Sequence, residues 1–187
     1  MGSSRPCSSK ISWDLSICAC KSKRIDLVLS LVKSEFLISM AQGKPIYVEH
    51  QTKIRVRYSE TDQMGVVYYG NYAQYFEVAR VEFLRDLGFV YKELEDQGVI
   101  MPVVHYSTDY KSPAKYDDEL TISTKIISLP AWQIKFDYEI FNQNERLVAK
   151  ATVILVFVNK QTFRPQQAPE YLIQLLEAHS NESNSIR

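Results

Sequence analysis

The residues with the clearest chemical potential lie in the stretch 60–71, which reads ETDQMGVVYYGN. Asp62 is followed there by two glycines, two valines and two adjacent tyrosines. A carboxylate beside an apolar, glycine-containing turn can cap a helix, close a turn by bonding to the backbone, or react with a bound molecule. The turn role is the usual one for an isolated Asp, so these residues alone leave the three roles open.

Other residue types that often carry chemistry are scattered along the chain. All three cysteines lie in residues 1–39, so the rest of the chain holds no thiol nucleophile, disulfide or cysteine metal site. The three histidines form neither a metal-binding spacing nor a pair with a nearby nucleophile. They are His50, His105 and His179. We therefore expect neither a metal nor a cofactor, and Asp62 remains the main candidate.

The elements that must position Asp62 can be inferred from the spacing of apolar residues. Residues 46–58 alternate apolar and polar side chains, which is typical of a half-buried strand. After this the spacing predicts a helix of about sixteen residues, with Asn71 as its N-cap and Gly88 just past its end. Its apolar stripe comprises Tyr72, Tyr75, Phe76, Ala79, Phe83 and Leu87. Val78 and Val81 lie off the stripe, so we expect the helix to be apolar over more than half its circumference.

The rest of the chain reads mainly as strands. A short helix is expected over 90–97, and a final amphipathic helix over 170–179. Between them lie four strand-like stretches, with turn-forming residues between the later ones. The four stretches are 100–110, 119–129, 131–142 and 146–159. Five antiparallel strands can bury an apolar helix only by curling around it, so we expect an α+β fold with one central helix.

The overall composition excludes several function classes. The chain has 187 residues, of which 45% are hydrophobic and 24% charged, as in an ordinary globular protein. Its formal net charge is zero, which indicates neither a nucleic-acid partner nor an anionic membrane surface. The longest apolar run, residues 151–158, is too short to span a bilayer and is typical of a buried strand.

Residues 1–39 differ in composition from the remainder of the chain. Their Ser, Lys and Arg content resembles that of an organelle transit peptide, but three acids interrupt the pattern. We favour the alternative that Met40 is the natural start and the first 39 residues are an upstream extension. The expected organisation is a leader over 1–39, one domain over 40–180 and a disordered tail over 181–187. The expected location is cytoplasmic, unless the leader directs import into an organelle.

The segment 56–84 closely resembles the signature of hotdog-fold thioesterases of the 4-hydroxybenzoyl-CoA thioesterase type. In that family the motif is roughly Tyr-x-x-Thr-Asp-x-x-Gly-Val-Val-Tyr-x-x-Asn-Tyr. The matching residues here are Tyr58, Thr61, Asp62, Gly65, Val66, Val67, Tyr68, Asn71 and Tyr72. The stretch 109–120 also resembles a strand–loop–strand segment of the family. The resemblance implies the hotdog fold, in which a five-stranded antiparallel sheet wraps around one long central helix.

The resemblance also implies an activity, the hydrolysis of an acyl-CoA thioester to a free acid and coenzyme A. Asp62 would be the catalytic carboxylate, either attacking the carbonyl carbon or activating a water, and both routes stay open. Backbone N–H groups at the helix start, those of Tyr69 and Gly70, are expected to bind the developing oxyanion. The loop and pocket are expected to include Gly65, Val66, Val67, Tyr68 and Asn71. Lys111 and Lys115 are candidate contacts for the coenzyme A phosphates.

Several alternatives remain open at this stage. Glu77 is a rival acid, because a second branch of hotdog thioesterases places its carboxylate on the central helix. Its place beside Arg80 favours a solvated or interfacial ion pair instead. Dehydratases of this fold use a histidine paired with an acid, and no histidine lies in residues 60–80. Hydrolysis of acyl-carrier-protein thioesters and a non-catalytic acyl-CoA-binding module are the competing functions. The tyrosines favour short, medium-chain or aromatic acyl groups.

The expected assembly is set by the open edges of the sheet. Native proteins rarely leave a long edge strand uncovered. Hotdog domains typically pair edge to edge in a dimer with active sites at the interface, and many dimers pair again. The resemblance therefore implies a homodimer at least, with a homotetramer as the expected form.

Overall fold

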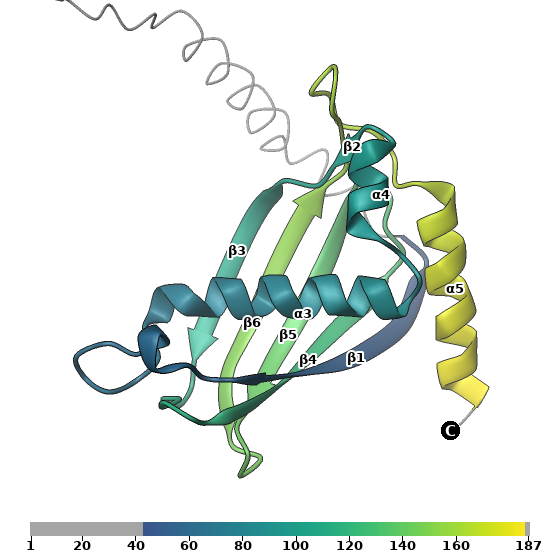
Figure 1. Ribbon diagram of the computed structural model, residues 1–187. Coiled ribbons are helices and arrows are strands. Elements are labelled where there is room, and N and C mark those ends of the chain that lie inside the picture. The colour runs from purple at the N-terminus through teal and green to yellow at the C-terminus, as the bar shows by residue number, and fades with distance from the viewer. Residues whose placement is uncertain (1–42, 186–187) are drawn as a thin grey trace, which may run out of the picture.

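The computed structural model describes residues 43–185, so the predicted leader lies outside the described residues. A five-stranded antiparallel sheet curls around one long helix, α3 (Tyr72–Asp86), which crosses its strands (Figure 1). The order of strands across the sheet is β1-β4-β5-β6-β3. The predicted α+β fold with one central helix is therefore confirmed. None of the helices within residues 43–185 is long and apolar enough to cross a membrane.

The strands follow the predicted stretches closely, except that two of those stretches are each divided in two. The main sheet contains β1 (Pro45–Arg55), β3 (Val103–Tyr110), β4 (Glu119–Ser128), β5 (Gln133–Phe141) and β6 (Leu147–Val156). A small second sheet pairs β2 (Val99–Ile100) with β7 (Val158–Asn159). Pro102 separates β2 from β3, since proline has no N–H to donate to a ladder. The predicted strand 100–110 is therefore divided at Pro102. The predicted strand 146–159 is also divided, at Phe157, into β6 and β7.

The first strand ends three residues earlier than predicted. The ladder between β1 and β4 stops at the pair Arg55–Glu119, because β4 begins at Glu119. Without a partner strand, the chain leaves the sheet and forms a single 3-10 turn, η1 (Tyr58–Glu60). The side chain of Tyr58, which was expected on the buried face of a strand, is 78% exposed.

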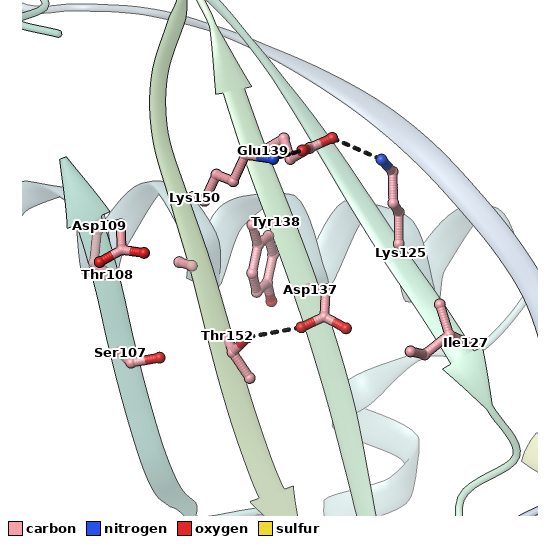
Figure 2. Close-up of a pocket in the computed structure, with 11 residues that line it drawn as sticks. Ser107, Thr108, Asp109, Lys125, Ile127, Asp137, Tyr138, Glu139, Lys150 and Thr152 are labelled. Carbon is pink, nitrogen blue, oxygen red and sulfur yellow. Dashed lines mark hydrogen bonds and ion pairs between the residues drawn. The ribbon is translucent and has the colours of Figure 1, made fainter. Parts of the chain in front are cut away.

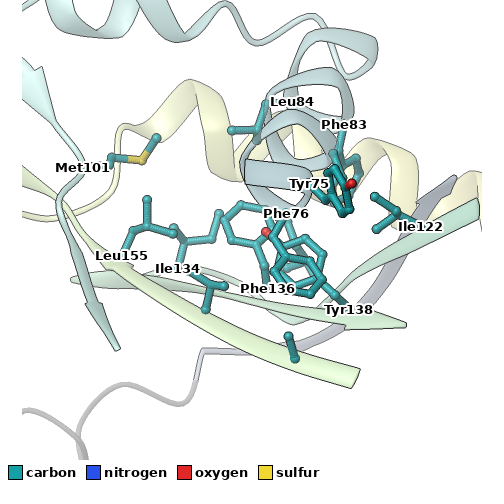
Figure 3. Packing of buried hydrophobic residues seen from close by; sticks show 14 of the residues in the cluster. Tyr75, Phe76, Phe83, Leu84, Met101, Ile122, Ile134, Phe136, Tyr138 and Leu155 are labelled. Carbon is teal, nitrogen blue, oxygen red and sulfur yellow. The ribbon is translucent and has the colours of Figure 1, made fainter. Parts of the chain in front are cut away.

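The core lies between α3 and the sheet (Figure 3). All six residues of the predicted stripe are buried. The ring of Phe76 lies 4.7 Å from that of Tyr138 on β5, and Phe83 stacks on His50 of β1 at 5.7 Å. Val78, by contrast, is 45% exposed, because the sheet covers only one side of the helix. The sheet therefore covers the predicted stripe, and Val78, which lies off that stripe, stays exposed.

Two further helices pack near the C-terminal end of α3 (Figure 1). The short α4 (Tyr91–Asp96) follows Gly88, whose φ of +82° ends α3 as predicted. The last helix, α5 (Glu170–Ser185), continues past the predicted end at residue 179 and lies against β1 (Figure 1). Leu172 and Leu176 of α5 are fully buried, and the N–H of Tyr47 donates to Ser180 Oγ at 3.3 Å.

Candidate active site

The segment between β1 and α3 carries Asp62 and projects past the β3 edge of the sheet (Figure 1). Glu60 holds this segment together. Its side-chain Oε2 accepts hydrogen bonds from the Arg57 N–H and the Tyr75 hydroxyl, each at 2.8 Å. Its carbonyl accepts from the Tyr68 N–H at 2.9 Å and from Asn71 Nδ2 at 2.7 Å. Four bonds to one residue therefore fix the two ends of the loop to each other.

Sequence reasoning missed Glu60, although one local signal was available. An acid three residues after the N-cap of a turn can reach back to the N-cap N–H, and Glu60 does this to Arg57. The same bonds change the expected role of Asn71. Asn71 occupies the position before α3, but its side chain donates to Glu60 and forms no cap bond to the helix.

Asp62 closes a tight turn with its own side chain. Its Oδ1 accepts from the Met64 N–H at 2.8 Å, while its N–H donates to the Val66 carbonyl at 2.9 Å. Gly65 donates to the Asp62 carbonyl and has φ +73°, a backbone conformation that favours glycine. The turn role that the sequence left open is therefore real, but it uses only one carboxylate oxygen. The other, Oδ2, has no protein hydrogen-bond partner in the described part of the chain.

The Asp62 side chain lies in a groove of about 360 Å³ between the loop, the start of α3 and the end of β3. Tyr72 and Tyr110 form one wall, with ring centroids 5.0 Å apart in an edge-to-face arrangement. The Tyr110 hydroxyl donates to the Tyr69 carbonyl at 3.1 Å, which ties β3 to the start of the helix. The remaining lining residues are Met64, Val66, Val67, Tyr69, Lys111, Ser112 and Pro113. We call this space the Asp62 groove.

Backbone donors are available beside this groove. A 3-10 turn, η2 (Tyr69–Asn71), leads into α3, and the Asn71 N–H bonds to the Tyr68 carbonyl at 2.9 Å. Within residues 43–185, the N–H groups of Tyr69 and Gly70 donate to no protein acceptor. A Cβ at Gly70 would meet the Tyr68 ring at 2.7 Å, so glycine allows that ring to cover this turn. The two amides that the family resemblance assigned to the oxyanion are thus unbonded.

Burial disfavours the ionised form of three tyrosines near the loop. Burial raises the pKa of Tyr72 to about 12, with the neighbouring Tyr110 adding to the effect. Burial likewise raises the pKa of Tyr110 and, together with its bond to Glu60, that of Tyr75. Among the residues lining the groove, Asp62 is the one acid and Lys111 the one base. A neutral aromatic wall around a single carboxylate suits an apolar acyl group next to a reactive oxygen.

Some of the other predicted site residues line the Asp62 groove, some only shape the loop, and one lies elsewhere. Val66, Val67 and Lys111 line the Asp62 groove, and Lys111 also forms a 3.8 Å ion pair with Asp109. Gly65, Tyr68 and Asn71 shape the loop without lining that groove. Lys115 lies in the loop between β3 and β4, exposed and away from the groove lining. The structure therefore brings one of the two predicted lysines to Asp62.

The rival candidates are not assembled into a second centre. Glu77 is exposed on α3, and in the described residues it forms no ion pair with the buried Arg80. A hollow on the outer face of the sheet holds Glu139 between Lys125 and Lys150, at 2.7 and 2.6 Å (Figure 2). Lys125 also lies 3.9 Å from Glu49, so the charges at this hollow are paired with one another. Across residues 43–185, no three His, Cys, Asp or Glu side chains are grouped to hold a metal ion.

Comparison with known proteins places this geometry in a family. Residues 56–176 match the model of the thioesterase-like superfamily. The chain belongs to the thioesterase-like superfamily. The match begins beside η1 and ends within α5. It contains the whole segment between β1 and α3, residues 56–71, which we call the Asp62 loop. The family predicted from the sequence motif is therefore confirmed.

Individual relatives of this thioesterase-like chain agree with the match. It is 40% identical over 115 residues to a putative acyl-CoA thioesterase, YneP, of Bacillus subtilis, covering 62% of this chain and 83% of that one. The crystal structure of a DHNA-CoA thioesterase from Staphylococcus aureus superposes with a TM-score of 0.66 at 35% identity, covering 73% and 91% of the two chains. A 4-hydroxybenzoyl-CoA thioesterase structure, at 22% identity and TM-score 0.63, covers 68% and 98% and shows the shared fold alone.

Proposed function

We propose that this protein hydrolyses acyl-CoA thioesters, with Asp62 as the reactive carboxylate. One observation carries the proposal. The unbonded Oδ2 of Asp62 shares a loop with two unbonded backbone N–H groups, those of Tyr69 and Gly70. Thioester hydrolysis needs both features, a basic or nucleophilic oxygen and donors for the oxyanion that forms on the carbonyl.

Two routes use the same groups. In the first, an Asp62 oxygen attacks the carbonyl carbon, the C–S bond breaks, and the thiolate leaves and takes a proton from water. A water molecule then hydrolyses the mixed anhydride that remains on Asp62. In the second, Asp62 accepts a proton from a water whose oxygen attacks the carbonyl, and the leaving thiolate recovers that proton. In both routes the negative oxygen of the intermediate accepts hydrogen bonds from the free amides.

The lining of the Asp62 groove supports short, medium-chain or aromatic acyl groups. Tyr72 and Tyr110 form an apolar wall whose edge-to-face geometry suits contact with another ring. The Tyr110 hydroxyl is engaged with the Tyr69 carbonyl, which keeps the wall in place. Lys111 at the groove is a candidate contact for a phosphate of coenzyme A.

A second copy of the chain would complete the site. The strand β3 is an edge of the sheet, and three of its apolar side chains are 42–48% exposed. They are Val103, Tyr106 and Tyr110. Because the Asp62 loop projects past this edge, pairing of two β3 strands would place each loop against the other subunit (Figure 1). We infer a homodimer as the active unit, with pairing of dimers into a homotetramer as its extension.

A substrate panel tests the activity. Purified protein is assayed with CoA thioesters of short, medium, long and aromatic acids, and release of the free thiol is followed. Cleavage of short, medium or aromatic esters supports the proposal. A protein that binds these esters without cleaving any would be a binding module instead. A protein that cleaves only acyl-carrier-protein thioesters would share the chemistry but not the proposed substrate.

A further inference from the structure

A second and larger groove, of about 770 Å³, borders the same loop. It lies between the end of β1, η1, the first two turns of α3 and the loop that joins β3 to β4. Glu60 lines this groove, whereas Asp62 lines the other one. The proposed chemistry makes no use of it. We call it the β1 groove.

Positive charge gathers along the β1 side of this groove. The side chains of Lys53 and Arg55 lie on one face of β1, because they are two residues apart in a strand. Arg57, just past the end of β1, lines the same groove. Lys53 and Arg55 both pair with Glu119, at 3.0 and 3.1 Å. Arg55 also binds Asp117.

Arg57 is the cation that remains available. Its guanidinium forms no ion pair with any acid in the part of the chain that the structure describes. The nearby Glu60 carboxylate is already bound by the Arg57 N–H and the Tyr75 hydroxyl. An unpaired arginine beside a groove is suited to a phosphate, whose oxygens match its fork of N–H donors.

Two exposed aromatic side chains stand at the same groove. Tyr58 is 78% exposed and Tyr116 is 56% exposed, and their rings meet edge to face with centroids 5.4 Å apart. Aromatic side chains that serve only to stabilise a fold are usually buried. A pair of exposed rings next to cations therefore indicates a binding surface. Such rings stack on nucleobases, and arginine beside them holds the phosphates.

We propose that the β1 groove binds the nucleotide end of coenzyme A, with the adenine on Tyr58 and Tyr116 and a phosphate on Arg57. This rests on the proposed acyl-CoA hydrolysis and adds a binding site for the common part of its substrates. Tyr58 precedes Asp62 by four residues, a stretch that spans at most about 14 Å of extended chain. The flexible pantetheine arm can bridge that distance between nucleotide and thioester.

The proposal separates two substrate classes. An acyl-CoA and an acyl carrier protein both present the acyl group on a pantetheine arm. Only coenzyme A ends in adenine and a 3′-phosphate. Contacts at Tyr58 and Arg57 would therefore strengthen binding of CoA esters and leave a pantetheine ester without its nucleotide unaffected.

A kinetic comparison tests whether the β1 groove binds the nucleotide end of coenzyme A. The same acyl group is supplied on coenzyme A and on pantetheine, to wild type, Arg57→Ala, Tyr58→Ala and the control Arg164→Ala, whose exposed arginine lies outside this groove. We expect Arg57→Ala to raise KM for the CoA ester about tenfold, the size of one hydrogen bond to a charged group, with kcat unchanged. Arg164→Ala should match wild type on both esters. Equal KM changes on the two esters, or none on either, would overturn the proposal.

A binding measurement separates this proposal from the activity itself. Adenosine 3′,5′-bisphosphate is titrated calorimetrically into wild type, Arg57→Ala and Arg164→Ala. Binding that Arg57→Ala weakens and Arg164→Ala does not supports the groove even if no thioester is cleaved. Absence of binding to wild type contradicts it, even if thioesters are cleaved. The kinetic comparison is repeated with the same acyl group on an acyl carrier protein. A rise in KM for Arg57→Ala that is confined to this substrate would show that the groove docks that protein, and would also contradict the proposal.

Discussion

The Tyr75 hydroxyl donates to Glu60 Oε2 at 2.8 Å, and this contact joins the first turn of α3 to the loop that carries Asp62. Tyr75 is itself almost fully buried, so this contact anchors the loop to the hydrophobic core. The carboxylate of Glu60 is thus a structural group, and the carboxylate of Asp62, two residues on, keeps a free oxygen. Two acids in one short loop have different roles because their partners differ.

Removing that contact should loosen the loop. Tyr75→Phe keeps the buried ring but takes away the donor, and we expect the free energy of unfolding to fall by about 1.5–3 kcal/mol, the range for a hydrogen bond to a charged group. Turnover should fall as well, because the Asp62 loop loses one of its anchors. Urea unfolding and steady-state assays measure both. The control Tyr58→Phe alters an exposed ring and should change stability by less than about 0.5 kcal/mol. Equal stability of the two variants would contradict this role of Tyr75.

Gly65 offers a test of backbone conformation alone. Its φ is +73°, and a Cβ placed there would meet no atom within 4 Å. Gly65→Ala should therefore cost about 1 kcal/mol of stability from the left-handed backbone only. Gly65→Asn should cost less, since asparagine tolerates this conformation better. Thermal unfolding should give the highest unfolding temperature for wild type, a lower one for Gly65→Asn and the lowest for Gly65→Ala. A Gly65→Asn protein less stable than Gly65→Ala would contradict this explanation.

The β3 edge can be tested by adding a charge. Tyr106 is 42% exposed, so Tyr106→Glu leaves its carboxylate solvated in a single subunit but buries it when two edges pair. We expect the dissociation constant of the proposed dimer to rise at least about a hundredfold and activity to fall with it. Light scattering over a dilution series measures the mass. The control Val90→Glu places the same charge at an exposed position just before α4, and dissociation there as well would exclude an edge-specific effect.

The charged network on the outer face predicts a pH dependence of stability. The hydrogen bond from Lys125, with Lys150 adding to it, lowers the pKa of Glu139 below its usual 4.5. A lowered folded-state pKa means that the stabilisation is complete above pH 4.5 and is lost as pH falls through the lower value. At about pH 7, the free energy of unfolding of Glu139→Gln should therefore be lower than that of wild type by on the order of 1 kcal/mol. At about pH 3 this difference between the two proteins should be smaller. Urea unfolding at both pH values tests this, and a gap that widened in acid would contradict the sign.

Local sequence patterns predicted the fold well, and their failures have a physical cause. The stripe of α3 was readable because burial follows the helical period. The end of β1 was not, because it depends on where the distant partner strand β4 begins, at Glu119. Tyr58 alternates like a strand residue, yet without a ladder partner it turns outward. Alternation predicts which face a residue takes only where a neighbouring strand exists.

Part of the candidate site could likewise be predicted from local sequence, and part could not. Asp62 and the amides after it belong to one continuous motif, so the sequence alone could single them out. The β1 groove combines Arg57 and Tyr58 with Tyr116, which only the folded loop between β3 and β4 brings together. Lys111 and Lys115 looked equivalent as lysines, and the end of β3 places only the first at the Asp62 groove. Contacts between distant segments need the register of the strands, which composition and spacing do not contain.

The most direct test of the central claim is the turnover of Asp62→Asn. Asparagine keeps an oxygen that can accept from the Met64 N–H, so the turn should persist while the negative charge is lost. We predict an unfolding temperature close to that of wild type and a kcat on CoA thioesters lower by about a thousandfold, within the range for a general base. A folded Asp62→Asn protein with wild-type kcat would contradict the account.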